Sequence, residues 1–176
     1  MIKVFLNDDL LAKHLALEIL KQLKRKKKLV LGCPGGRSLK KTYYYIGRLS
    51  SKLNISLNNL TIVMMDEYVD KKKGKYYLVN PKSHYSCVRF SQQVIKRLFN
   101  YKKNKKNELK KENILFPSID FPKTYDKKIN KIGDIDIFLL ASGSSDGHVA
   151  FNNYHSNISE KTHIIKCNMT IRSTRC

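Results

Sequence analysis

Two groups that can transfer protons, Asp146 and His148, lie two positions apart in the last part of the chain. They follow an apolar run, Ile135 to Ala141, which predicts a buried strand, and the small residues Ser142 to Ser145, which predict a turn. In an α/β protein, ligands bind just beyond the carboxyl ends of the strands. This stretch therefore places a carboxylate and an imidazole where a substrate would bind.

A glycine-rich turn earlier in the chain has the arrangement of a phosphate-binding loop. Residues 32–38 read G-C-P-G-G-R-S and lie between an expected strand and an expected helix, for which Ser38 is the expected cap. Glycines let the backbone approach an anion, and the N–H groups and dipole of a helix start attract it. The string is neither a Walker A loop nor G-x-G-x-x-G. An ordinary tight turn is an equally good interpretation of this string alone.

A third candidate is the acidic pair Asp66 and Glu67, which ends the apolar run of residues 60–65. Acids at the carboxyl end of a strand favour chemistry there, although acids also commonly cap loops. Residues 69–81, which are polar and rich in lysine, are expected to form a long loop or lid at the same end.

Apolar periodicity predicts an α/β fold with a mainly parallel sheet, because strand and helix patterns alternate along the chain. The first helix should bury a stripe from Leu11 to Leu23. We expect a single domain over residues 1–176. The expected helices cover residues 8–28, 39–53, 84–99 and 123–132, and the expected strands cover residues 29–31, 60–65, 114–117 and 135–141.

Composition limits the class of protein. A chain of 176 residues with 41% hydrophobic residues can form one folded domain and is not disordered. We find no secretory signal and no apolar run near the about 20 residues of a membrane span, so we expect a cytoplasmic protein without a membrane partner. The four cysteines form no C-x-x-C pair and there is no paired histidine cluster, which predicts neither a metal site nor disulfides.

The net charge of +21 raises the possibility of a nucleic-acid partner. The lysines form blocks at residues 24–28, 71–75 and 102–111, at expected helix ends and loops. No block alternates with aromatic residues in an RNA-binding pattern. We therefore expect solvated surface charge and at most nonspecific nucleic-acid binding at low salt.

Four strings together resemble the glucosamine-6-phosphate deaminase/isomerase family, in the order and approximate spacing of that family. They are L-G-C-P-G-G-R-S (31–38), M-D-E-Y (65–68), N-P-K-S-H-Y-S (80–86) and G-S-S-D-G-H-V-A-F-N (143–152). The resemblance implies a Rossmann-like fold. The sister group, 6-phosphogluconolactonase, shares the fold and an Asp-Gly-His motif, but Tyr68 and Val149 to Asn152 favour the deaminase side.

The resemblance also implies a reaction, the conversion of an aldose phosphate into a ketose phosphate with or without loss of ammonia. His148 matches the residue that opens the sugar ring, Asp146 its orienting partner, and Asp66 the base that moves a proton between C2 and C1. The turn residues Gly35, Gly36, Arg37 and Ser38 would bind the phosphate. The resemblance implies no metal and no organic cofactor, and a small sugar phosphate as the partner. Assembly into a homo-oligomer is left open.

The sequence departs from the family in two places. Asn153 occupies the position of a relay glutamate, and because an amide cannot ionise, ring opening would be slower or the substrate different. Members of the family also continue past the position of Cys176 with residues that bind the phosphate, and neither Arg172 nor Arg175 aligns with them. We therefore expect a sheet that is incomplete at its C-terminus. Four alternatives stay open: an isomerase or deaminase, an inactive sugar-phosphate-binding remnant, a lactonase-like hydrolase, and, ranked last, a nonspecific basic nucleic-acid binder.

Overall fold

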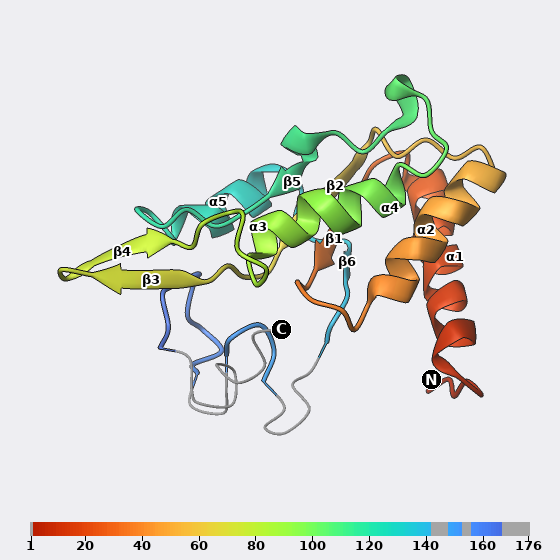
Figure 1. Cartoon of the computed structure of the whole chain (residues 1–176). Coiled ribbons are helices and arrows are strands. Elements are labelled where there is room, and N and C mark those ends of the chain that lie inside the picture. Colours follow the sequence, from red (N-terminus) through yellow and green to blue (C-terminus); the bar gives the residue numbers. More distant parts are fainter. Residues whose placement is uncertain (1, 142–147, 153–155, 167–176) are drawn as a thin grey trace.

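The computed structural model describes residues 2–141, 148–152 and 156–166 of the chain. Within these residues, a parallel sheet forms the centre of the fold, with its strands in the order β5-β2-β1-β6 (Figure 1). Its strands are β1 (Leu29–Cys33), β2 (Leu60–Met64), β5 (Ile114–Leu115) and β6 (Ile137–Phe138). The first strand pairs with the second on one side and with the last on the other, so the strand order reverses between β1 and β6. The predicted α/β fold with a mainly parallel sheet is confirmed.

Helices cover the two faces of this sheet unequally. The longer helices are α1 (Asp8–Lys26), α2 (Lys40–Lys52) and α5 (Thr124–Lys131). Three further elements, α3 (Cys87–Phe90), η1 (Ser91–Lys96) and α4 (Arg97–Phe99), follow one another without a break and are called the helical run. Two short turns are η2 (Lys105–Asn107) and η3 (Lys111–Asn113). One face buries Leu31 and Ile62 against α1, α2 and the helical run. The other face buries Val30 and Val63 with Tyr125 of α5. Alternation along β1 and β2 therefore supplies two cores of different size.

Most of the stripe predicted for the first helix is buried. The Asn7 side chain caps this helix by accepting a hydrogen bond of 2.9 Å from the backbone N–H of Leu10. The predicted stripe residues Ala12, Ala16, Ile19 and Leu23 are buried, as expected. Leu11 is wrong, since it is 40% exposed, and Leu20 is buried beside the stripe.

Two predicted helix starts are wrong by a few residues. The second helix begins at Lys40, and its cap position is Leu39, which makes no side-chain capping hydrogen bond. Ser38 is exposed and does not cap it. The third begins at Cys87, where the Ser86 hydroxyl accepts a hydrogen bond of 3.2 Å from the N–H of Arg89.

The segment expected to be a loop over residues 69–81 is largely a β-hairpin. Strands β3 (Val69–Lys72) and β4 (Lys75–Leu78) pair antiparallel and extend from the body of the fold (Figure 1). Lys73 and Gly74 connect them with φ angles of 47° and 79°. A two-residue turn with both φ angles positive matches the twist of a hairpin, so this turn overrides the polar composition of the strands.

Among the described residues, none of the helices combines the length and the apolar composition needed to cross a bilayer.

A close helix crossing holds α2 against the helical run. A Cβ atom placed on Gly47 of α2 would lie 1.8 Å from the carbonyl oxygen of Leu98. The two backbones therefore touch at this point, beside the edge-on packing of Tyr43 against Phe99. The crossing fixes the helical run relative to the sheet, and the start of that run lies in the candidate site.

Gly47→Ala should destabilise the protein by about 1–3 kcal/mol, because the added methyl group forces the two helices apart. Helix propensity alone would give the opposite sign, a gain of about 0.5–1 kcal/mol. Urea unfolding measures the difference. Lys40→Ala, an exposed change in the same helix, should stay within about 0.5 kcal/mol of the wild type. A Gly47→Ala protein at least as stable as the wild type would contradict the crossing.

Candidate active site

Asp66 follows the carboxyl end of β2 and lies where three segments of the chain meet. Its Oδ1 atom accepts a hydrogen bond of 3.4 Å from the thiol of Cys87, at the start of α3. A Cβ atom on Gly35 would lie 3.7 Å from the same oxygen and 2.8 Å from the sulfur of Cys87. The glycine turn after β1, the acid after β2 and the first residue of the helical run are therefore in direct contact.

The surroundings of Asp66 hold it close to the point of proton exchange. Burial raises the pKa of Asp66 to about 6; the hydrogen bond from Cys87 opposes this, the charge of Glu67 adds to it, and His148 lowers it. The effect of His148 on Asp66 places the imidazole within electrostatic reach of the acid. A carboxyl group with this pKa can both accept and release a proton near neutral pH.

Glu67, next to this acid, has a structural role. Its Oε1 atom accepts from the backbone N–H groups of Tyr68 (2.7 Å) and Cys87 (3.0 Å). Its Oε2 atom accepts from the Ser86 hydroxyl (2.9 Å) and from the N–H of Val88 (2.7 Å). Glu67 therefore caps the helical run from a distant strand, and its negative charge lies at the positive end of that helix.

Three of the family-like strings meet in an aromatic cluster. Tyr68 packs edge-on against Tyr85 with ring centroids 5.5 Å apart, and against Phe151 at 4.7 Å. These residues belong to M-D-E-Y, N-P-K-S-H-Y-S and the string that contains His148. The fold thus brings together Tyr68 and Phe151, which lie 83 positions apart in the chain (151 − 68), and the order of the strings alone did not require this contact.

Two buried tyrosines hold the strand ends around the site. The Tyr43 hydroxyl donates to the carbonyl oxygen of Pro34 at 3.0 Å, directly before the glycine turn. The Tyr125 hydroxyl lies 2.9 Å from the carbonyl oxygens of both Met64 and Leu115, so it bridges the ends of β2 and β5. These bonds fix the ends of three neighbouring strands from both faces of the sheet.

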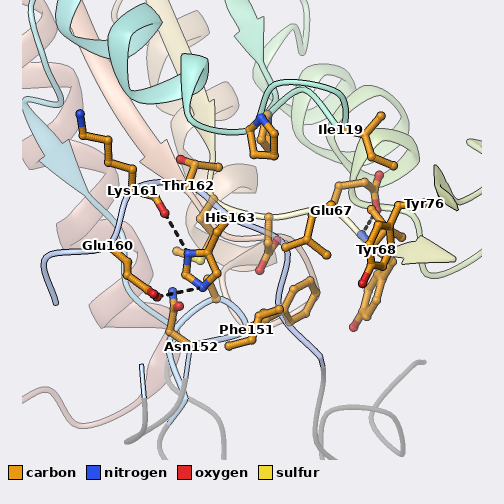
Figure 2. Close-up of a pocket in the computed structure, with 18 of the residues that line it drawn as sticks. Glu67, Tyr68, Tyr76, Ile119, Phe151, Asn152, Glu160, Lys161, Thr162 and His163 are labelled. Atoms are coloured by element: carbon orange, nitrogen blue, oxygen red, sulfur yellow. Dashed lines mark hydrogen bonds and ion pairs between the residues drawn. The ribbon is translucent and has the colours of Figure 1, made fainter. Parts of the chain in front are cut away.

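A cavity of about 1200 Å³ lies against Asp66. The segments around it are the strand-end residues 65–71, part of β4, residues 117–126, and residues 150–152 and 156–166. Figure 2 shows His163 on its wall, joined to Glu160 and to the backbone of Lys161. The cavity presents both carboxylates and cationic side chains, so it suits a polar, charged ligand.

The structure brings together some of the predicted site residues and leaves others apart. Gly35, Asp66 and His148 share one neighbourhood. Gly36, Arg37 and Ser38 are exposed on the turn. Of the predicted catalytic and phosphate-binding residues that the structure describes, Asp66 lines the cavity, whereas Gly35, His148 and the rest of the turn do not. Asp146 and Asn153 lie outside the described residues. Within the described part of the chain, no three His, Cys, Asp or Glu side chains are grouped to bind a metal ion.

Sequence reasoning missed three residues of the site, Glu67 as a helix cap, Cys87 and Tyr125. Their contacts join positions that are distant in the chain, so no local spacing indicates them. For Glu67 and Cys87 the sequence held one indirect signal. Ser86 can cap a helix that starts at Cys87, and an acid is favourable near the first turn of a helix. A lone tyrosine in a polar helix gives no comparable signal.

The strand order and the contacts at Asp66 define a Rossmann-like fold with its candidate site at the carboxyl edge of a parallel sheet. The solved structure of a monomeric glucosamine-6-phosphate deaminase superposes with a TM-score of 0.77 at 23% identity, over 94% of this chain and 64% of that one. The solved structure of a 6-phosphogluconolactonase from Thermotoga maritima superposes with a TM-score of 0.59 at 20% identity, over 82% of this chain and 60% of that one. At these identities the likeness establishes the fold.

The sequence comparisons are more specific. No protein-family profile matches the chain. The glucosamine-6-phosphate deaminase of Mycoplasma mycoides subsp. mycoides is 31% identical over 171 residues, which are 95% of this chain and 63% of that protein. The glucosamine-6-phosphate deaminase of Phocaeicola vulgatus is 31% identical over 144 residues, which are 78% of this chain and 48% of that protein. The predicted resemblance to the glucosamine-6-phosphate deaminase/isomerase family is therefore confirmed, and the chain spans less than two thirds of the length of these relatives.

Glu67→Gln should destabilise the protein by about 2–3 kcal/mol. The amide carries no charge, and its NH₂ group would face N–H or hydroxyl donors from which the carboxylate of Glu67 accepts hydrogen bonds. Urea unfolding measures the loss. Glu112→Gln, an exposed change of the same chemistry, should stay within about 0.5 kcal/mol of the wild type. Equal stability of the two variants would show that the carboxylate does not cap the helical run.

Asp66→Asn should stabilise the protein at pH 8 by about 1–2 kcal/mol and have little effect at pH 4. The pKa of Asp66 is raised in the folded state, so folding favours the protonated acid. The native carboxyl thus stabilises the fold below its ordinary pKa, and this contribution is lost as pH rises through about 6. Thermal and urea unfolding across this range measure the difference. A stability difference that does not change with pH would contradict the burial of this acid.

Proposed function

We propose that the protein is an aldose–ketose isomerase of the glucosamine-6-phosphate deaminase type, acting on a hexosamine 6-phosphate. The main support is the acid at the end of β2: Asp66, with a pKa of about 6, within reach of His148. An isomerase needs one group that takes a proton from carbon and returns it to the neighbouring carbon. The sequence relatives named above support the amino sugar as the substrate.

In the proposed reaction, His148 moves the proton of the C1 hydroxyl to the ring oxygen of the sugar, and the ring opens to the aldehyde. Asp66 then removes the proton from C2 and returns it to C1, while O1 gains a proton and the nitrogen loses one, so the C1 aldehyde becomes an alcohol and C2 becomes a carbon–nitrogen double bond. Water adds to C2 and the nitrogen leaves as ammonia, which gives a ketose 6-phosphate. Asp146 would orient the imidazole, and Asn153 could do so only through a neutral hydrogen bond.

The phosphate would bind at the glycine turn. Gly36 has φ +89°, a conformation that L side chains rarely adopt, and a Cβ there would meet nothing within 4 Å, so its backbone is open to a ligand. Helix α2 starts at the end of this turn without a side-chain cap, so no side chain covers its positive end, although the N–H of Lys40 donates to the carbonyl oxygen of Arg37. Arg37 and Ser38 are exposed beside it and would add a positive charge and a hydroxyl.

The test is to incubate the purified protein with glucosamine 6-phosphate and to measure ammonia and fructose 6-phosphate together. Asp66→Asn and His148→Gln should each reduce turnover by about 10²–10⁴-fold. Asp134→Asn and His14→Gln make the same chemical changes away from the site and should retain wild-type turnover. Ketose formation without ammonia would assign the protein to isomerases that keep the C2 substituent. Thermal stabilisation by the sugar phosphate without turnover would support a binding remnant instead.

The pH dependence of kcat/KM gives a separate check on Asp66. The base acts when it is unprotonated, so kcat/KM should rise with pH through a midpoint of about 6 and then level off. The measurement uses ammonia release between pH 4.5 and 8. A limb with its midpoint near the ordinary value for an aspartic acid would contradict the assignment of a buried Asp66 as the base.

A further inference from the structure

The thiol of Cys87 is fixed on three sides at the candidate base. Its backbone N–H donates to Glu67 Oε1 at 3.0 Å, which anchors the residue at the start of the helical run. Its sulfur lies so close to the turn that a Cβ on Gly35 would be 2.8 Å away. Its S–H group donates to Asp66 Oδ1 at 3.4 Å, and the residue is only 6% exposed. Neither the backbone nor the sulfur can move far without disturbing a neighbour.

We propose that Cys87 is a positioning residue for Asp66, whose thiol engages Oδ1 and so turns Oδ2 toward the substrate. The catalytic meaning of this contact rests on the proposed function, but the contact itself does not. A carboxylate that must reach both C2 and C1 of a sugar needs a fixed orientation, and a hydrogen bond to one oxygen provides it. Cys87 acts through Asp66 and does not itself touch the reacting atoms.

A thiol suits this task because it is a weak donor that stays protonated. Burial raises the pKa of Cys87 far above its ordinary range, and the charges of Asp66 and Glu67 raise it further. The group is therefore a permanent S–H donor and a poor nucleophile. A hydroxyl in its place would donate more strongly to the carboxylate and make Asp66 a weaker base, whereas a methyl group would donate nothing.

Three other groups around Asp66 are less suited to this role. Glu67 carries the same charge as Asp66 and accepts rather than donates. The hydroxyls of Tyr43 and Tyr125, which face the site from α2 and α5, lie within hydrogen-bond distance of main-chain carbonyl oxygens. The thiol of Cys87 donates to Asp66 Oδ1.

The test is a direct titration of Asp66, which needs no turnover. Protein labelled with ¹³C at the aspartate carboxyl groups is titrated by NMR between pH 4 and 8, and the Asp66 signal is assigned by its loss in Asp66→Asn. Cys87→Ala should move the Asp66 midpoint up by about 0.5–1 pH unit, because the carboxylate loses a donor. Cys87→Ser should move it down or leave it in place, and should restore a wild-type-like signal if the alanine variant folds poorly.

Cys33→Ala removes the other described thiol, which is buried at the end of β1, and should leave the Asp66 midpoint within about 0.2 pH unit of the wild type. A Cys87→Ala midpoint equal to that of the wild type would overturn the proposal. The pH profile of kcat/KM should move in parallel with the NMR midpoint. A shifted NMR midpoint in a protein without turnover would uphold the contact and reject the proposed function, so the two failures are distinguishable.

Discussion

The side chain of Glu67 joins the sheet to the helical run of residues 87–99, and the geometry of the site depends on this junction. Its two oxygens accept four hydrogen bonds, three of them from residues at the start of that run. Because Glu67 directly follows Asp66, the bonds that seat the helix also fix the backbone of the candidate base. Cys87, the first helical residue, is thereby brought to Asp66 by the same carboxylate. One charged group thus sets the distance between an acid and a donor that are 21 residues apart.

The position of the site follows from the order of the strands. Since β1 pairs with β2 on one side and β6 on the other, the strand order reverses at β1, and ligands of parallel α/β sheets bind beside such a point at the carboxyl edge. The glycine turn leaves β1, Asp66 leaves the neighbouring β2, and the chain toward His148 leaves β6. Parallel pairing keeps these exits on one edge, and the hydroxyls of Tyr43 and Tyr125 fix the strand ends. The three candidate groups converge because of topology and not because of any local motif.

This explains which parts the sequence could predict. The apolar runs predicted where the four described strands of the parallel sheet lie, but the buried strand expected over residues 135–141 is wrong: β6 is only Ile137–Phe138 at the sheet edge, and Phe138 and Leu140 are exposed. Asp66 could be chosen because an acid directly after such a run must lie at the carboxyl edge. The same reasoning could not separate Asp66 from Glu67, since the two differ only in which way their side chains point. Cys87 was out of reach, because its contact depends on where a distant helix starts. The hairpin was missed because its lysines suggest a loop, while the turn at Gly74 decides the structure.

The two helix starts near Asp66 also differ in a way that bears on where an anion can bind. At the start of the helical run, Glu67 already satisfies the N–H groups of Cys87 and Val88 with a negative charge. A phosphate there would meet a carboxylate of its own sign and find those donors occupied. Helix α2 starts after the glycine turn with no side-chain cap, and its neighbours Arg37 and Lys40 are exposed. Electrostatics therefore favours the glycine turn for the phosphate, which leaves the sugar carbons to extend toward Asp66.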